Sequence, residues 1–225
     1  MAFSFFMRDQ HVLELAAEHL VQFAVGRTRI RVWDAGCAMG QETWSLAMIL
    51  AERMNRHGFM NLRIDATDHD SENRFGDIVT DAVYPARDLA RTPVALVGRY
   101  FEPVEGSGGE RLKVCGQLRQ LVTFHYHDLL SGKPVGGNYC LILCKNVLLH
   151  LQYEQRVDVF RMFHEALTPD GYLATEQTQM LPPEVGHLFE RVAPDARIYR
   201  RLDPALQEKS SHCPNSTLNE PEGGT

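Results

Sequence analysis

The sequence predicts an α/β protein in which helices cover both faces of a doubly wound, largely parallel sheet. Helix-like and strand-like patterns alternate along the chain, and this alternation is typical of βαβ units. The segment Tyr139–Cys144 reads YCLILC, a continuous apolar run expected of a parallel strand that is covered on both faces. The chain has 225 residues, of which 44% are hydrophobic, and this suffices for one domain with a substantial core.

The expected elements follow from the spacing of apolar residues. Helical spacing predicts a first helix over 9–25, with Asp9 as a possible N-cap, and a second over 42–56 that Gly58 can end. Further helices are expected over 155–167 and near Pro183. Strands are predicted at 30–33, 62–66, 122–127, 139–144, 172–175 and 196–202.

One part of the chain does not fit the parallel sheet. The region 71–98 has a weak pattern in which we place only a helix and a loop. Two alternating runs then flank the glycine-rich turn 106–109, which predicts a small antiparallel hairpin. We therefore expect one domain over 1–203 with an inserted β-subdomain at about 98–120, followed by a polar tail over 204–225 that we predict to be disordered.

Composition excludes several classes of protein. The net charge of −6 gives no basis for general binding to nucleic acid or to an anionic membrane. No apolar run approaches the roughly 20 residues that span a bilayer, and the N-terminus lacks the pattern of a secretory signal. The five cysteines lack paired metal-ligand spacing. The sequence thus predicts a cytoplasmic protein without membrane insertion.

Candidate binding residues follow the predicted strands directly. In an open α/β sheet, ligands bind at the carboxyl ends of the strands. After the first strand, residues 34–40 combine an acidic residue with small residues and two glycines, and a helix begins beyond them. Asp68 and Asp70 follow the second strand, Asp128 the third and Asn146 the fourth. Each of these residues alone could have a purely structural role, such as a helix cap for Asp70. Their convergence on one edge of the sheet is a more specific indication of a ligand-binding site.

The glycine pattern narrows the choice of ligand. A dinucleotide site requires G-x-G-x-x-G with an acidic residue about 20 positions further on, but here only Gly36 and Gly40 are present, and Asp68 lies further away. The G-K-[ST] of a phosphate loop is also absent. S-adenosylmethionine fits these features, with its ribose at Asp68, its adenine at Asp128 and its methionyl group over the loop.

Motifs in a fixed order resemble those of the chemotaxis receptor methyltransferases, the CheR family. SFFMRD at 4–9 resembles the family's T-x-F-F-R-[DE], and AGCAMGQETWS at 35–45 resembles its A-G-C-S-T-G-E-E-P-Y-S. The segments ATDHD, HDLL and LCKNVLLHL resemble its A-T-D-I-D, N-L-L and F-C-R-N-V-M-I-Y-F. The RYF segment and the glycine turn resemble its β-subdomain, so that the resemblance covers about 4–199.

This resemblance implies a Rossmann-like class I methyltransferase sheet, with S-adenosyl-L-methionine as cofactor and S-adenosyl-L-homocysteine as product. Ser4 and Arg8 would close over the cofactor, and Arg8 and His150 would be the catalytic residues at the reacting end. The cofactor-binding residues that the resemblance implies are Ser4, Arg8, Ala35, Gly36, Cys37, Gly40, Glu42, Asp68, His69, Asp128, Leu129, Asn146 and Val147.

The implied activity is that of a protein-glutamate O-methyltransferase in chemotaxis signal transduction. Its partner would be the cytoplasmic helices of a chemoreceptor-like protein, docked in part through the β-subdomain, and no nucleic acid would take part. A glutamate side chain, with a pKa of about 4.3, is already ionised at neutral pH and needs no general base. Catalysis then consists mainly of positioning and desolvation.

Several positions depart from the family pattern and keep alternatives open. Lys145 and His150 stand where the family has arginine and tyrosine, Gln177 and Gln179 replace its histidine and glutamate, and Gln41 replaces an acidic residue. We expect this protein to lack the helical N-terminal domain that is usual in the family. The alternatives are a methyltransferase that uses His150 as a base for another nucleophile, a member that binds without turnover, and a NAD-linked reductase. His125 and His127 could share a metal, but no third ligand is evident, so we expect none.

Overall fold

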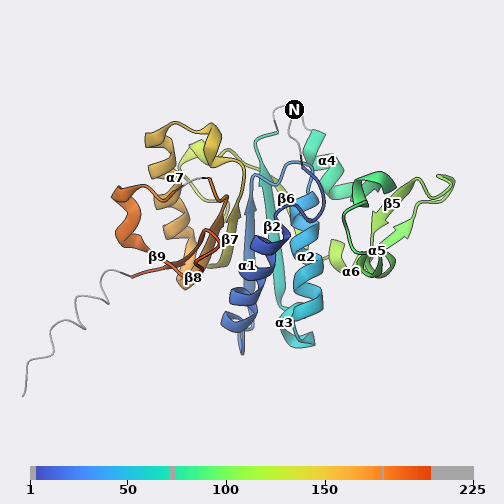
Figure 1. Ribbon diagram of the computed structural model, residues 1–225, viewed down its shortest axis with the longest axis horizontal. Helices are drawn as coiled ribbons and strands as arrows, with labels where there is room; N and C mark the ends of the chain where they lie inside the picture. The colour runs from blue at the N-terminus through green and yellow to red at the C-terminus, as the bar shows by residue number, and fades with distance from the viewer. Residues whose placement is uncertain (1–3, 71–73, 179, 204–225) are drawn as a thin grey trace, which may run out of the picture.

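The central element of the fold is a seven-stranded sheet. The computed structural model describes residues 4–70, 74–178 and 180–203. Within these residues the strand order is β6-β2-β1-β7-β8-β10-β9, with helices on both faces (Figure 1). The parallel strands are β1 (Ile30–Ala35), β2 (Leu62–Asp68), β6 (Val122–Tyr126), β7 (Tyr139–Cys144) and β8 (Leu167–Thr175). β10 (Ile198–Arg201) runs antiparallel to β8 and to β9 (Phe189–Arg191). The chain switches direction across the sheet at β1, which confirms the predicted doubly wound α/β class.

Helices cover the two faces unequally. The α-helices are α1 (Gln10–Phe23), α2 (Gln41–Arg53), α3 (Arg56–Met60), α4 (Arg74–Asp81), α5 (Val94–Tyr100), α6 (Gly116–Arg119) and α7 (Tyr153–Ala166). The 3-10 helices are η1 (Ala86–Leu89), η2 (Leu129–Ser131), η3 (Leu148–His150) and η4 (Pro183–Leu188). α1 and α2 pack against each other across the middle of the sheet, whereas α7 lies with η4 on the other side (Figure 1).

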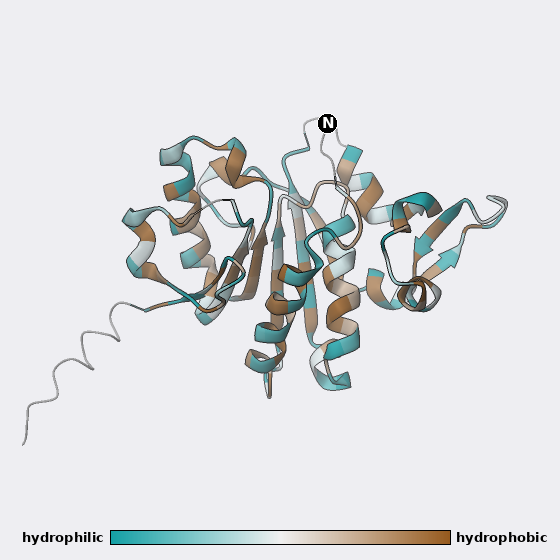
Figure 2. Cartoon of the chain, viewed as in Figure 1, coloured by the Kyte–Doolittle hydropathy of each residue, from teal (hydrophilic) through white to brown (hydrophobic). Residues whose placement is uncertain are grey.

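The apolar strands explain why the sheet is buried between two cores. Leu141 and Leu143 of β7 face the core that contains α1 and α2. Ile142 and Cys144 face the core that contains α7. Alternate side chains of one strand point to opposite faces, so a strand covered on both sides must be apolar throughout. Brown strands near the centre of Figure 2 show this apolar part of the sheet, whereas β2 and β6 also carry polar residues.

The predicted hairpin is present, but a third strand joins it. β4 (Phe101–Pro103) and β5 (Arg111–Val114) pair antiparallel around the glycine turn, and β3 (Val83–Pro85) pairs with the other edge of β5. This small sheet projects at the right of Figure 1. Neither β3 nor β9 was predicted, because a strand of three residues is too short to display an alternating pattern.

Four local predictions need correction or lie outside the structure. Asp9 occupies the N-cap position of α1 at φ 49°, but its side chain makes no capping hydrogen bond. Gly58 lies inside α3 and does not end α2, which stops at Arg53. The strand predicted at 172–175 is longer in the structure, because β8 begins at Leu167 and continues through Asp170 at φ 59°. The tail over 204–225 lies outside the described residues.

Candidate functional site

The strand ends β1, β2, β6 and β7 surround a cavity of about 620 Å³. This volume lies in the range of pockets that bind nucleotide-sized ligands. The lining residues are Ser4, Arg8, Gly36, Cys37, Ala38, Glu42, Asp68, His69, Phe75, His127, Asp128, Leu129, Leu130, Lys145, Asn146, Val147, Leu149, His150 and Leu151. They come from the N-terminal segment, from the loop between β1 and α2, and from the segments that follow the other three strands.

The cavity gathers most of the residues that the sequence analysis singled out for cofactor binding or catalysis. Those that line it are Ser4, Arg8, Gly36, Cys37, Glu42, Asp68, His69, Asp128, Leu129, Asn146, Val147 and His150. Ala35 and Gly40 are not among the lining residues. Ala35 is buried in the core on the α7 side. Gly40 has φ 83°, and a Cβ there would lie 2.9 Å from the Val79 side chain. Gly40 therefore allows the loop to turn close to α4, on the side away from the cavity.

Sequence reasoning missed several residues of the cavity wall. Ala38, Phe75, Leu130, Leu149 and Leu151 line the cavity. All are apolar, so no chemical pattern marked them as ligand-facing. Lys145 also lines it, although the sequence had marked this position only as a departure from the family pattern.

Gly36 allows the loop after β1 to approach the loop after β7 closely. Its φ is 95°, and a Cβ at this position would lie 2.2 Å from Cγ2 of Val147. The amides of Gly36 and Cys37 both donate to the Thr67 carbonyl, at 2.8 and 2.9 Å. A side chain here would therefore be both strained and sterically excluded.

Asp68 is held in place by the same loop. Its Oδ2 accepts a hydrogen bond of 2.8 Å from the Ala38 amide. Burial raises the pKa of Asp68, while the Ala38 hydrogen bond opposes this shift. Asp70 has the capping role that the sequence offered as its alternative, because its Oδ2 accepts from the Phe75 and Gly76 amides at the start of α4. Asp68 is therefore the carboxylate of this pair that remains at the cavity.

A buried ion pair forms another part of the cavity wall. Nζ of Lys145 lies 2.7 Å from Oε2 of Glu42, at the first turn of α2, and 3.3 Å from Oδ2 of Asp9. The Lys145 side chain is fully buried. Ammonium and carboxylate groups removed from water need such pairing, so Lys145 balances the charge of Glu42 inside the protein.

The N-terminal segment is anchored beside the cavity by apolar and polar contacts. Phe6 is buried, with its ring centroid 5.0 Å from that of Tyr84. The Met7 amide donates to Oγ of Ser45 at 2.9 Å. Arg8 donates to Oδ1 of Asn146 at 2.8 Å. These contacts bring Ser4 and Arg8 to the cavity, a position that helical periodicity alone does not predict.

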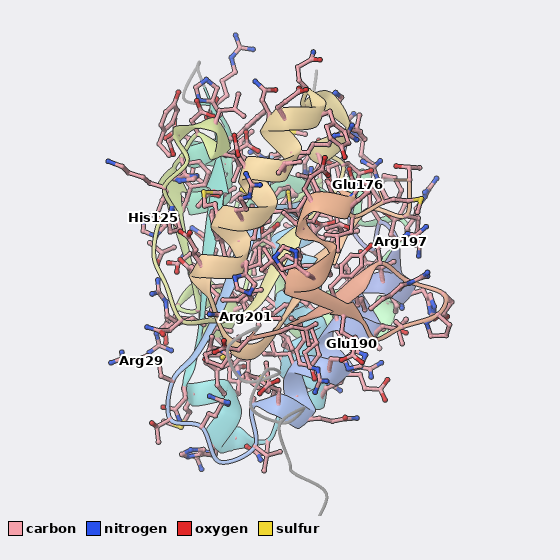
Figure 3. The ribbon with its side chains drawn as sticks, turned by 90° about the vertical axis from the view of Figure 1, so that its left-hand side faces the viewer. Arg29, His125, Glu176, Glu190, Arg197 and Arg201 are labelled. Atoms are coloured by element: carbon pink, nitrogen blue, oxygen red, sulfur yellow. The ribbon has the colours of Figure 1, made fainter. Side chains whose placement is uncertain are left out.

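The loop after β7 is supported from the end of β8. Asn146 has φ 60°, and its amide donates to Oε2 of Glu176 at 3.3 Å, while the Leu149 amide donates to Oε1 at 3.2 Å. Figure 3 places Glu176 in the upper half of the molecule, well away from Arg201 and Glu190 near the other end of the sheet. His150 is exposed at the end of η3.

The two histidines that could have shared a metal have separate partners. Nε2 of His125 lies 3.0 Å from Oδ1 of Asp65, and Nε2 of His127 lies 2.7 Å from the Lys133 carbonyl. In the part of the chain that the structure describes, no group of three His, Cys, Asp or Glu side chains is placed to hold a metal ion.

The side chains of the cavity suit a particular ligand chemistry. Three carboxylates, those of Glu42, Asp68 and Asp128, line it together with Arg8 and Lys145. Carboxylates bind ribose hydroxyls and ammonium groups but repel phosphates. The residues present therefore fit a ligand with a nucleoside and an amino-acid end, such as S-adenosylmethionine.

Comparison with known proteins agrees with this chemistry. A probable chemotaxis protein methyltransferase from Rhizobium etli is 25% identical over 92% of this chain and 78% of its own length. A chemotaxis protein methyltransferase from Vibrio anguillarum is 26% identical over 77% of this chain and 63% of its own length. An uncharacterized 104.1 kDa protein from Rhodobacter capsulatus is 30% identical over 89% of this chain but only 21% of its own length.

Two further comparisons concern the fold and the family. A solved DszA carbon methyltransferase superposes with a TM-score of 0.45 at 16% identity, covering 74% of this chain and 35% of that one. Residues 2–197 match the family described as CheR methyltransferase, SAM binding domain. The chain therefore belongs to the CheR methyltransferase family, as an S-adenosylmethionine-dependent methyltransferase domain.

Proposed function

We propose that this domain forms methyl esters on glutamate side chains of a chemoreceptor-like protein. The observation that carries the proposal is the position of Arg8, whose guanidinium is held by Asn146 at the wall of the cofactor cavity. A guanidinium is well suited to a carboxylate, whether that of the cofactor or that of the acceptor. The relatives named as chemotaxis protein methyltransferases support a protein acceptor in chemotaxis.

The residues divide between the parts of the cofactor. In this proposal Asp68 binds the ribose, Asp128 the adenine amino group, and Glu42 the ammonium of the methionyl end. When bound, S-adenosylmethionine supplies an activated methyl group. The protein then has to hold an ionised carboxylate in line with that group and exclude water. The carboxylate oxygen forms the new bond to carbon, and the bonding electrons of the broken C–S bond remain on sulfur.

The site does not need a general base for this acceptor. A glutamate side chain is ionised near neutral pH. His150 is exposed at the cavity, but with this acceptor it has no proton to remove. If the acceptor were instead a nitrogen or a hydroxyl group, a histidine base would make the rate rise between about pH 6 and 7. A glutamate acceptor leaves the rate flat over that range.

The partner would approach the face on which the cavity opens. Leu130 and Leu149, both cavity residues, are large apolar side chains that remain exposed, and apolar side chains at the mouth of a site suit contact with a helix of the partner. We place a second contact on the β-subdomain, whose glycine turn projects from the molecule (Figure 1). No helix that the structure describes combines the length and apolarity of a membrane span. We expect the protein to act in the cytoplasm.

A transfer assay tests the proposal directly. The domain is incubated with methyl-tritiated S-adenosylmethionine and the cytoplasmic helical fragment of a chemoreceptor, and the label is then challenged with alkali. We expect label that is released as methanol, because a methyl ester is alkali-labile. The variant Asp68→Ala should lose both transfer and S-adenosylhomocysteine binding.

Two results would contradict the proposal in different ways. Alkali-stable label would show another acceptor nucleophile. Calorimetric binding of S-adenosylhomocysteine without transfer to any receptor fragment would favour a domain that binds without turnover. A receptor fragment with its acceptor glutamates changed to alanine is the matched control.

A further inference from the structure

Two adjacent residues of the N-terminal segment are bonded to two adjacent residues of the loop after β7. Arg8 donates to Oδ1 of Asn146 at 2.8 Å. Asp9 lies 3.3 Å from Nζ of Lys145. We call these four residues, Arg8, Asp9, Lys145 and Asn146, the clasp. It joins segments that are far apart in the sequence beside the same cavity.

The backbone of the clasp is in a conformation that it would not adopt by itself. Asp9 and Asn146 of the clasp have φ of 49° and 60°, and Met7, which directly precedes the clasp, has φ of 59°. Asparagine and aspartate tolerate this left-handed region, but methionine rarely occupies it, so the surrounding structure holds Met7 there. Strained backbone of this kind often occurs at ligand-binding sites, and here it lies beside the cavity that Arg8, Lys145 and Asn146 line.

Lys145 is the member of the clasp that connects it to the floor of the cavity. Its fully buried ammonium lies 2.7 Å from Oε2 of Glu42 as well as near Asp9. Asp34 is a further buried carboxylate that interacts with both Glu42 and Lys145. Removing the lysine would leave the largely buried Glu42 carboxylate without its cationic partner, and the Glu42 side chain would have to move to reach another one.

We propose that Lys145 is a positioning residue for the amino-acid end of the cofactor. By holding Glu42 it fixes the carboxylate that meets the methionyl ammonium, and by holding Asp9 it keeps Arg8 at the cavity wall. This role rests on the part of the proposed function that places the methionyl group at Glu42. It does not depend on which acceptor is methylated.

Two ligands separate positioning from general structural support. S-adenosylhomocysteine carries the amino-acid end, whereas 5′-methylthioadenosine has the same nucleoside without it. Calorimetry on the whole chain should show that Lys145→Met lowers the affinity for S-adenosylhomocysteine about tenfold or more, because a charge-assisted contact is lost. The affinity for 5′-methylthioadenosine should change less than about threefold.

Three further variants sharpen the test. Lys145→Arg should retain S-adenosylhomocysteine affinity, because a guanidinium can still bridge two carboxylates. Lys133→Met, at an exposed lysine outside the cavity lining, is the matched control and should change neither affinity. Asp9→Asn alters a half-exposed carboxylate and leaves the core intact. Asp9→Asn should lower the affinity for S-adenosylhomocysteine but not that for 5′-methylthioadenosine, and by a smaller factor than Lys145→Met. If Lys145→Met does not fold, Asp9→Asn provides the test of the positioning role.

The results that overturn the proposal are distinct from those that overturn the methylation of glutamate. An equal loss of both ligands would assign Lys145 a purely structural role, and an unchanged S-adenosylhomocysteine affinity would exclude any role. A wild-type chain that bound neither ligand would overturn the cofactor site and this role together. Selective losses as predicted, in a chain that esterified no receptor, would support the role of Lys145 and overturn only the acceptor.

Discussion

At the scale of single residues, Gly36 shows how strictly the site limits the sequence. Its φ of 95° is unfavourable for any other residue, and Cγ2 of Val147 occupies the space a Cβ would need. Both restrictions come from the same fact, which is that two loops from neighbouring strands touch at this point. The resemblance to the family pattern identified Gly36, but only the structure gives this second reason for it.

We predict that Gly36→Ala destabilises the protein and weakens S-adenosylhomocysteine binding. The strain and the contact with Val147 together should cost about 1–3 kcal/mol of unfolding free energy, measured by urea denaturation. Val147→Ala in the same chain should restore part of this loss, because Cγ2 is removed. Gly98→Ala is the control, since Gly98 lies in α5 with nothing within 4 Å of an added Cβ. Equal stability of Gly36→Ala and wild type would refute the steric explanation.

At the scale of elements, the end of β8 supports the loop that follows β7. Glu176 is only 4% exposed and accepts hydrogen bonds from the backbone amides of Asn146 and Leu149. One side chain therefore accepts hydrogen bonds from two backbone amides of the loop that follows β7. Since Asn146 also accepts from Arg8, Glu176 is linked through this loop to the N-terminal residue Arg8.

We predict that Glu176→Ala lowers the free energy of unfolding by about 2 kcal/mol, because two backbone amides lose their acceptor. Glu176→Gln should cost less, since the amide oxygen can still accept from one of them. Chemical denaturation at neutral pH measures both. Glu190→Gln breaks an exposed pair with Arg200 and should change stability by less than about 1 kcal/mol. A similar loss of unfolding free energy in all three variants would contradict the role of Glu176 in supporting the loop after β7.

At the scale of the whole molecule, a buried acid makes stability depend on pH. Asp34, in β1, is 1% exposed, and its Oδ2 accepts a hydrogen bond from Oγ1 of Thr43 in α2. Its Oδ1 has no hydrogen-bond partner among the described residues. Burial, reinforced by Glu42, raises the pKa of Asp34 to about 8. The folded chain thus holds a proton that the unfolded chain releases near pH 4.

We predict that this contribution to stability falls as the pH rises from about 4 to about 8, since over that window the unfolded state binds fewer protons. Asp34→Asn removes the titrating group, so its unfolding free energy should decline less than that of wild type between pH 5 and 8. Urea denaturation at several pH values gives both curves. Asp158→Asn, at an exposed position, should follow wild type. Parallel curves for Asp34→Asn and wild type would contradict the prediction.

The sequence predicted the sheet better than it predicted the fine structure of the site. β7 was correct at both ends because a strand buried on both faces is apolar throughout. Asp68, Asp128 and Asn146 were found because they follow strand ends, whereas Ser4, Arg8 and Glu42 were indicated only by the family resemblance. The pairing of Asp9 with Lys145 was not found, because it joins distant segments and Asp9 resembles an ordinary cap. β3 was missed because a three-residue strand derives its conformation from its partners.

The central place of β1 has a consequence for how the chain folds as it leaves the ribosome. β1 pairs with β2 on one edge and with β7 on the other. Val32 is in register with Leu141, which is synthesised much later than β1. Until β7 is synthesised, that edge and its apolar side chains have no partner, and open edges of this kind invite pairing with other chains. Synthesis must therefore pass the middle of the sequence before β1 can be protected and the clasp can form.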